Sequence, residues 1–163
     1  MLKVKSGDLD KMALLFQRYH RPLYGFLYHM TGQREASEDM VQNVFYRMLR
    51  SRHTFTGDGE FKTWMYHLAR NVWKDHLRKS GREGVSRPVE ESLAAEEFVD
   101  ERLEKKLELE MLQRRIDSLS PENREVLVLS RYQDLKYAEI AGILDISVAA
   151  VKVRIHRAIH QLK

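Results

Sequence analysis

Between Phe61 and Lys79 the sequence FKTWMYHLARNVWKDHLRK places hydrogen-bond donors and cations at helical spacing on one strip. The strip consists of His67, Arg70, Asn71, Lys74 and Arg78. Guanidinium and ammonium groups neutralise phosphates, and aromatic rings stack on bases of any identity. The same periodicity places Lys62, Tyr66 and Trp73 on a flank of the strip. This combination is typical of a surface for single-stranded nucleic acid, although a solvated amphipathic helix fits the segment as well.

A second group of donors lies near the C-terminus. Leu135 to Ile143 predicts a short helix, Asp145 a left-handed turn, and Ser147 the N-cap of a second helix over Val148 to Leu162. This order is that of a helix-turn-helix, whose second helix enters the major groove. The outward face of that helix carries Lys152, Val153, His156, Arg157 and His160. Arg or Lys contacts to guanine edges there would each contribute about 1–3 kcal/mol of base discrimination, while a plain helical hairpin is the alternative.

Apolar periodicity predicts the helices that must hold these two surfaces. Helical patterns cover Asp8 to Thr31 and Ser37 to Arg50, and Pro22 predicts a kink or a restart in the first of them. The glycine-containing loop Thr54 to Glu60 then delivers the chain into the basic helix. The seam of that helix, which we expect to be buried, consists of Phe61, Met65, Leu68 and Val72. The predicted fold is therefore all-α.

The charge distribution of the 163-residue chain separates two basic segments from an acidic one. The net charge is only +4, but Phe61 to Pro88 and Ser147 to Lys163 are basic, whereas Val89 to Glu110 is acidic. Helical signals stop near Ser80 and Gly81. They resume clearly at Met111, and Ser120 with Pro121 marks a further helix start. We therefore expect two small helical domains, residues 1–80 and 111–163, joined by a flexible acidic linker over 81–110, which is partly helical from about Ala94.

Several classes of function find no support in the composition. The chain has no cysteine, which excludes disulfides and thiolate metal sites. No apolar run is long enough to cross a membrane, and the N-terminus lacks the apolar core of a secretory signal, so we expect a soluble, cytoplasmic protein. His156 and His160 have the spacing of two metal ligands, but a pair of side chains facing DNA explains them better. We expect no cofactor and no enzyme activity.

With both surfaces in view, the chain resembles the extracytoplasmic-function (ECF) sigma factors of bacterial RNA polymerase, in the sigma-70 family. The resemblance covers almost the whole chain and rests on four segments in the family's order: EDMVQNVFYRM, TFTGDGEFKTWMYHLARNVWKDHLRK, SLSPENREVLVLSRYQDLKYAEIAGILDIS and AVKVRIHRAIHQL. It implies that the first domain is sigma region 2, which docks on the polymerase and opens and reads the minus-ten promoter element. The second would be sigma region 4, a helix-turn-helix that reads the minus-thirty-five element.

The resemblance also assigns residues to these tasks. The motif that docks on the coiled coil of the largest polymerase subunit would contribute Asp39, Gln42, Asn43 and Phe45, with Asn43 where an acidic residue is common. The minus-ten contacts would come from Thr56, Gly57, Asp58, Gly59, Glu60, Lys62, Trp64, Arg70, Asn71, Lys74 and Arg78. Among these, the loop Thr56 to Glu60 and Asn71 resemble a clamp around a base flipped from the non-template strand, and Trp64 fits the core equally well. The minus-thirty-five contacts would come from Ser147, Lys152, Val153, Arg154, His156 and Arg157.

The implied partners are core RNA polymerase, through that coiled coil and the flap of the second-largest subunit, promoter DNA in duplex and single-stranded form, and an anti-sigma factor. Two other functions stay open from the residues alone. One is a regulator that binds duplex DNA through the C-terminal module, and the other is a sigma-like protein that sequesters polymerase or a partner. Both leave the strip between Phe61 and Lys79 without a dedicated purpose.

Overall fold

The computed structural model describes residues 1–57, 60–81 and 101–162, and the side chains of these ranges except those of residues 101–104. Two predicted clamp residues, Asp58 and Gly59, and most of the predicted linker lie outside the described residues. The regular elements within these ranges are all helices: α1 (Leu2–Lys5), α2 (Lys11–Thr31), α3 (Arg34–Arg50), the 3-10 turn η1 (Arg52–Thr54), α4 (Phe61–Ser80), α5 (Glu101–Asp117), α6 (Pro121–Arg131), α7 (Tyr137–Leu144) and α8 (Val148–Leu162).

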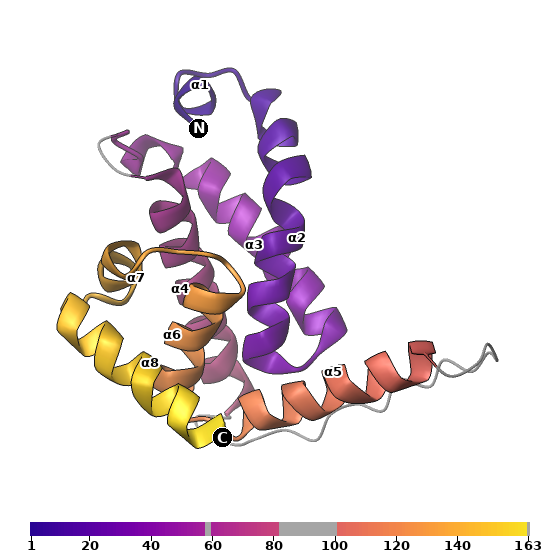
Figure 1. The fold of residues 1–163 in the computed structure, drawn as a ribbon. Helices are drawn as coiled ribbons and strands as arrows, with labels where there is room; N and C mark the ends of the chain where they lie inside the picture. Colours follow the sequence, from indigo (N-terminus) through magenta and orange to yellow (C-terminus); the bar gives the residue numbers. More distant parts are fainter. Residues whose placement is uncertain (58–59, 82–100, 163) are drawn as a thin grey trace.

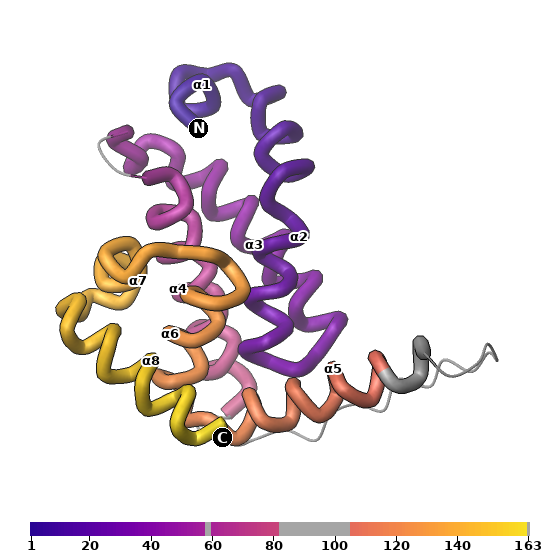
Figure 2. Tube along the Cα trace, viewed as in Figure 1, coloured from indigo at the N-terminus to yellow at the C-terminus, as the bar shows by residue number. Residues whose placement is uncertain are grey.

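Helices α2, α3 and α4 form the N-terminal bundle, and α6, α7 and α8 form a second, C-terminal group (Figure 1). The two groups pack directly against each other, α4 against α7 and α2 against α6. Figure 2 shows the resulting arrangement. The C-terminal group runs along one side of α4, and α1 lies beside the N-terminal end of α2. The sequence predicted the two groups but not their packing.

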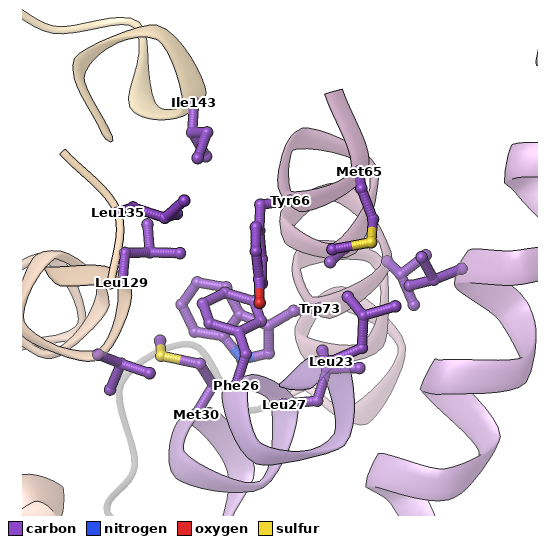
Figure 3. Close-up of a cluster of buried hydrophobic side chains, with 14 of the residues drawn as sticks. Leu23, Phe26, Leu27, Met30, Met65, Tyr66, Trp73, Leu129, Leu135 and Ile143 are labelled. Carbon is purple, nitrogen blue, oxygen red and sulfur yellow. The ribbon is translucent and has the colours of Figure 1, made fainter. Parts of the chain in front are cut away.

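One hydrophobic core runs through both groups. Leu23, Phe26 and Leu27 of α2 are completely buried, and Leu129, Leu135 and Ile143 of the C-terminal group belong to the same cluster. Tyr66 of α4 lies between these two sets, with the ring of Phe26 edge-on to it at 5.5 Å (Figure 3). The buried side chains therefore join the groups into a single packed unit.

Local chemistry explains the ends of the C-terminal helices. The Ser120 hydroxyl accepts a hydrogen bond from Asn123 N at the start of α6, and that of Ser147 from Ala150 N at the start of α8. Asp145 ends α7 in the left-handed conformation, with φ 56° and ψ 48°. The N-caps and the turn predicted from the sequence are confirmed.

Of the two outcomes predicted at Pro22, a restart of the helix does not occur. Helix α2 runs through Pro22 without interruption. Proline removes one backbone donor, and the residues just after it lie in the core, where their burial outweighs that loss. Helix α5 covers Glu101–Asp117, so it includes the end of the segment that was expected to be partly helical, where Glu, Lys and Leu are strong helix formers. Leu107 and Met111, which helical spacing places on one side of α5, are 50% and 56% exposed.

Candidate nucleic-acid interface

The basic strip of α4 is only partly open to solvent. Lys62, His67, Lys74 and Arg78 are exposed, whereas Arg70 and Asn71 are half-buried. The amide of Asn71 lies 3.5 Å from Nδ1 of His67, one turn earlier. Arg78 is paired with Asp75, which also accepts a bond of 2.6 Å from Arg47 of α3. These two guanidinium groups hold the pKa of the Asp75 carboxyl below its usual value.

Arg70 forms an ion pair with the C-terminal group. Its Nε donates to Oε1 of Glu125 over 2.8 Å, and the side chain of Glu125 is only 4% exposed. Burial raises the pKa of Glu125, and the charge of Arg70 opposes that shift. Sequence reasoning missed this acid, because a glutamate in the first turns of α6 looks like an ordinary surface residue.

The aromatic flank expected beside the strip is not available for stacking on bases. Tyr66 is 2% and Trp73 5% exposed, so this expectation was wrong. The Tyr66 hydroxyl donates to Oε1 of Gln133 over 2.5 Å, and burial raises the pKa of that hydroxyl. Both rings face the C-terminal group, which covers the side of α4 that periodicity had assigned to solvent.

A cavity of about 490 Å³ lies where the loop before α4 meets α7. Its lining consists of Thr54, Phe55, Thr56, Glu60, Thr63, Trp64 and His67 on one side and Ala138, Glu139 and Gly142 of α7 on the other. Trp64 is half-buried, with its ring 5.3 Å from that of Phe55. The volume and the aromatic lining suit one nucleobase.

Helix α1 supports the loop that precedes this cavity. The Lys5 ammonium donates to the carbonyl oxygen of Phe55 over 2.7 Å. A β carbon at Gly57, which has φ 86°, would lie 3.0 Å from a methyl carbon of Leu2. The positive φ favours glycine at this position, and any larger residue would also require the exposed Leu2 side chain to shift. No local pattern indicates these contacts, because they join residues far apart in the chain.

The exposed face of α3 carries most of the predicted polymerase-docking motif. Asp39, Gln42 and Asn43 are exposed. Phe45 is not, since it is 7% exposed and its ring lies 4.9 Å from that of Phe16. It supports the helix from within, and the neighbouring Tyr46, at 61% exposure, is the aromatic residue that this face presents.

Helix α8 separates a buried face from a cationic one. Val151, Ile155 and Ala158 are buried, whereas Lys152, Val153, His156 and Arg157 are exposed together with the N-cap Ser147. Arg154 departs from this pattern. It is half-buried, and its charge acts on the carboxyl of Glu125.

A polar contact between α2 and α5 centres on His29 of α2. Its Nδ1 donates to Oε1 of Gln113 over 2.7 Å, and its ring lies 4.2 Å from that of Tyr132. Burial lowers the pKa of His29, while Gln113 and the nearby charge of Asp117 partly oppose that shift. The folded chain therefore binds this proton less readily than the unfolded chain.

The His29 contact gives a pH prediction. It stabilises the fold fully above about pH 6.5, and the stabilisation is lost as the pH falls through the lowered pKa. We expect the difference in free energy of unfolding between the native chain and His29→Asn to shrink as the pH falls from about 7.5 to about 5.5. Urea denaturation at several pH values measures this difference, and a constant difference would show that His29 does not titrate in this window.

Metal and membrane features do not explain the site. Within residues 1–57, 60–81 and 101–162, no group of three or more His, Cys, Asp or Glu side chains is placed to hold a metal ion. Among the helices of the same ranges, none is long and apolar enough to span a bilayer.

Comparison with known proteins identifies both groups of helices. Residues 15–83 match the family model described as Sigma-70 region 2, and residues 109–162 match the model described as Sigma-70, region 4. The chain is 32% identical to the ECF RNA polymerase sigma factor SigW of Bacillus subtilis, over 99% of this chain and 91% of that protein. It is also 32% identical to the ECF RNA polymerase sigma-E factor of Escherichia coli K12, over 96% of this chain and 86% of that protein.

Two solved structures share the fold. CnrH, in a complex with the cytosolic domain of CnrY, has a TM-score of 0.77 at 24% identity and covers 99% of this chain and 90% of its own. RpoE of Bartonella quintana, in a complex with NepR, has a TM-score of 0.75 at 21% identity and covers 92% of each chain. The two sigma-70 regions define a transcription initiation factor. By its sequence relatives, the chain belongs to the ECF sigma factors and acts as an RNA polymerase sigma factor.

Proposed function

We propose that individual surfaces of this chain carry the separate steps of initiation. Residues 1–80 act as the module that docks on core polymerase and opens and reads the minus-ten element. Residues 111–163 read the minus-thirty-five element, and residues 81–110 connect the two. The cytoplasm, where the polymerase meets the chromosome, is the expected site of action.

The observation that carries the proposal is the division of α8 into two faces. The completely buried Val151 and Ala158 fix the helix against α6 and α7, so the opposite face points outward. Lys152, His156 and Arg157 lie on that outward face. A helix presented in this way, after a tight turn, has the geometry that places side chains on base edges in the major groove.

The minus-ten step is assigned to α4 and the cavity beside it. Extruding a base from the duplex costs a few kcal/mol of stacking and pairing, and a pocket that holds the extruded base offsets that cost. The aromatic cavity next to Trp64 and His67 provides the pocket, and Asn71 lies one turn further along α4. Lys62, Arg70 and Lys74 follow the path of the strand's phosphates.

Partner binding follows from the exposed surfaces and from the relatives. The face of α3 with Asp39, Gln42 and Asn43 is the proposed contact with the largest polymerase subunit, and the C-terminal group is the proposed contact with the flap of the second-largest subunit. RpoE of Bartonella quintana is bound to an anti-sigma factor. We expect an anti-sigma factor for this chain as well.

Core-dependent transcription tests the proposal. Promoters are selected from a random library with core polymerase and the purified chain, and run-off transcripts are then measured with and without the chain. We expect initiation only when both proteins are present. Binding of duplex DNA without core-dependent initiation would instead indicate a DNA-binding regulator, and polymerase binding that blocks transcription would indicate a sequestering protein.

Asn71→Ala tests the base clamp. Loss of one hydrogen bond to the extruded base is expected to weaken promoter opening by about 1 kcal/mol while leaving core binding intact. Permanganate reactivity of unpaired thymines measures the opening. Asn123→Ala, which removes the same side chain from α6 outside the proposed surface, is the control. Unchanged reactivity in Asn71→Ala would exclude Asn71 from the clamp.

A further inference from the structure

A second cavity, of about 570 Å³, lies between α2, the first turns of α4 and the turn that follows α6 (Figure 1). Its floor is a stripe of α2 whose members share one face of the helix: Arg18, Pro22, Gly25 and His29. It has no lining residue in common with the cavity beside Trp64. Sites for small organic ligands measure about 300–1,000 Å³. The second cavity is therefore a separate site of suitable size.

One end of this cavity is cationic. Arg18, Arg21 and Lys62 line it, and all three are exposed. Lys62 of α4 lies at the same end as Arg18 of α2, because the rings of their neighbours Phe61 and Tyr19 pack together at 5.0 Å. Two helices thus bring three positive charges to one place.

These three cations have no acidic partner in the part of the chain that the structure describes. The ion pairs found there all use other basic residues. The guanidinium of Arg18 instead lies 5.5 Å from the centre of the Tyr19 ring. Of the described residues that line the cavity, only Asp134 is acidic. Like charges that lack a counter-charge repel one another, so an anion that binds between them is stabilised.

The other end of the cavity carries hydrogen-bonding groups. The side-chain nitrogen of Gln133 lies 3.8 Å from the place where a β carbon on Gly25 would be. Asp134 comes next in the chain, in the left-handed conformation with φ 56°. Gly25 lies two turns after Arg18 on α2, which corresponds to about 10 Å along the helix. The carboxylate and the cations therefore lie at different ends of an elongated site.

Pro22 adds a backbone acceptor between these ends. Proline has no N–H, so the carbonyl oxygen of Arg18 does not receive the hydrogen bond that residue 22 would otherwise donate within α2. Pro22 itself lines the cavity. A ligand hydroxyl can donate to this oxygen. The site thus presents cations, then a carbonyl oxygen, then a carboxylate.

We propose that this cavity binds a guanine nucleotide with at least two phosphates. Arg18, Arg21 and Lys62 hold the phosphates, because guanidinium and ammonium groups form charge-assisted hydrogen bonds to phosphate oxygens. The ribose donates to the carbonyl oxygen of Arg18, and the base stacks on the Tyr132 ring, which lines the cavity and is 39% exposed. The carboxylate of Asp134 accepts from N1–H and from the amino group of guanine. Adenine has only one donor on that edge.

Nucleotide binding at this site does not depend on the proposed role of α4 in promoter opening. Lys62 is the only residue that the site takes from the proposed path of the strand. The site can therefore be tested without DNA or polymerase, and Lys62 is left unchanged in the test.

Calorimetric titration of the purified chain with GDP tests the site directly. We expect GDP to bind at one site per chain. Inorganic diphosphate keeps the negative charges but lacks the stacking base, so we expect it to bind at least about tenfold more weakly. Absence of GDP binding would overturn the proposal, and so would equal affinity for the two probes.

A double variant locates the phosphates. Arg18→Ala combined with Arg21→Ala removes two charge-assisted contacts and should weaken GDP binding at least about tenfold. Arg50→Ala combined with Arg114→Ala removes two exposed cations outside the cavity and should leave the affinity unchanged. If the first double variant binds GDP as tightly as the native chain, the nucleotide does not occupy this cavity.

Asp134→Asn tests the reading of the base. Asparagine also tolerates the left-handed conformation, so the turn should be kept. We expect the native chain to prefer GDP to ADP, and the variant to lose about tenfold in affinity for GDP but not for ADP. Equal affinities of the native chain for GDP and ADP would contradict the assignment of Asp134. Weaker binding of single-stranded DNA by the arginine double variant, with no GDP binding by the native chain, would assign these cations to the promoter strand instead.

Discussion

Phe26→Ala is expected to lower the free energy of unfolding of the whole chain by about 3–5 kcal/mol. Phe26 is completely buried in α2, and its ring packs edge-on against Tyr66 at 5.5 Å. Removing the ring leaves a cavity at the point where the N-terminal bundle and the C-terminal group share their core (Figure 3). A typical domain is stable by only about 5–15 kcal/mol, so this loss is large.

Because the core is shared, we expect Phe26→Ala to destabilise the N-terminal bundle and the C-terminal group together. Hydrogen exchange of the α8 amides should accelerate together with that of the α2 amides, and urea should unfold both groups in one transition. If α8 keeps its native protection in Phe26→Ala, the two groups are independently stable and the core is not continuous in solution. Phe26→Leu, which leaves a smaller gap and should cost less, keeps the test usable if the alanine variant does not fold.

Phe16→Ala is the matched control for this prediction. Phe16 lies on the same helix, but it is 42% exposed and contacts His20 and Phe45 at the edge of the bundle. Truncation of a partly exposed ring removes less buried surface and leaves no enclosed cavity. We expect a smaller loss of stability, and no change in the exchange of the α8 amides.

The features that the sequence predicted correctly depend on local chemistry. The N-caps Ser120 and Ser147 accept bonds from backbone amides three residues later, and Asp145 adopts the left-handed turn by itself. Each of these requires only a few neighbouring residues, so the order of residues is sufficient. The helix-turn-helix could therefore be located from the amino-acid sequence alone.

The features that the sequence missed depend on contacts between distant segments. Tyr66 and Trp73 lie outside the seam predicted for α4, and periodicity alone assigned them to solvent. Helix α4 in fact buries two faces, one in the N-terminal bundle and one against the C-terminal group. Glu125 gave no local sign of burial because its partner Arg70 is 55 positions away. Periodicity shows which side chains share a face, but not how many faces are covered.

Arg157→Ala is expected to reduce initiation from promoters with the preferred minus-thirty-five sequence by an amount equivalent to about 1–3 kcal/mol. Arg157 is exposed on the outward face of α8, opposite the buried Val151 and Ile155, so its removal should leave the fold intact. If the guanidinium contacts a base, the loss is confined to promoters that carry that base. Transcription from promoter pairs that differ at single minus-thirty-five positions measures this.

Lys152→Ala separates base reading from backbone binding on the same face. A lysine that contacts only phosphate should weaken every promoter by a similar factor, and should reduce by about one the slope of log affinity against log salt. Arg131→Ala, which removes an exposed cation from α6, is the control for a general loss of charge. Arg157→Ala would then change the ranking of the minus-thirty-five variants, while Lys152→Ala would preserve it. If neither variant changes the ranking or the salt slope, the outward face of α8 does not read the upstream element.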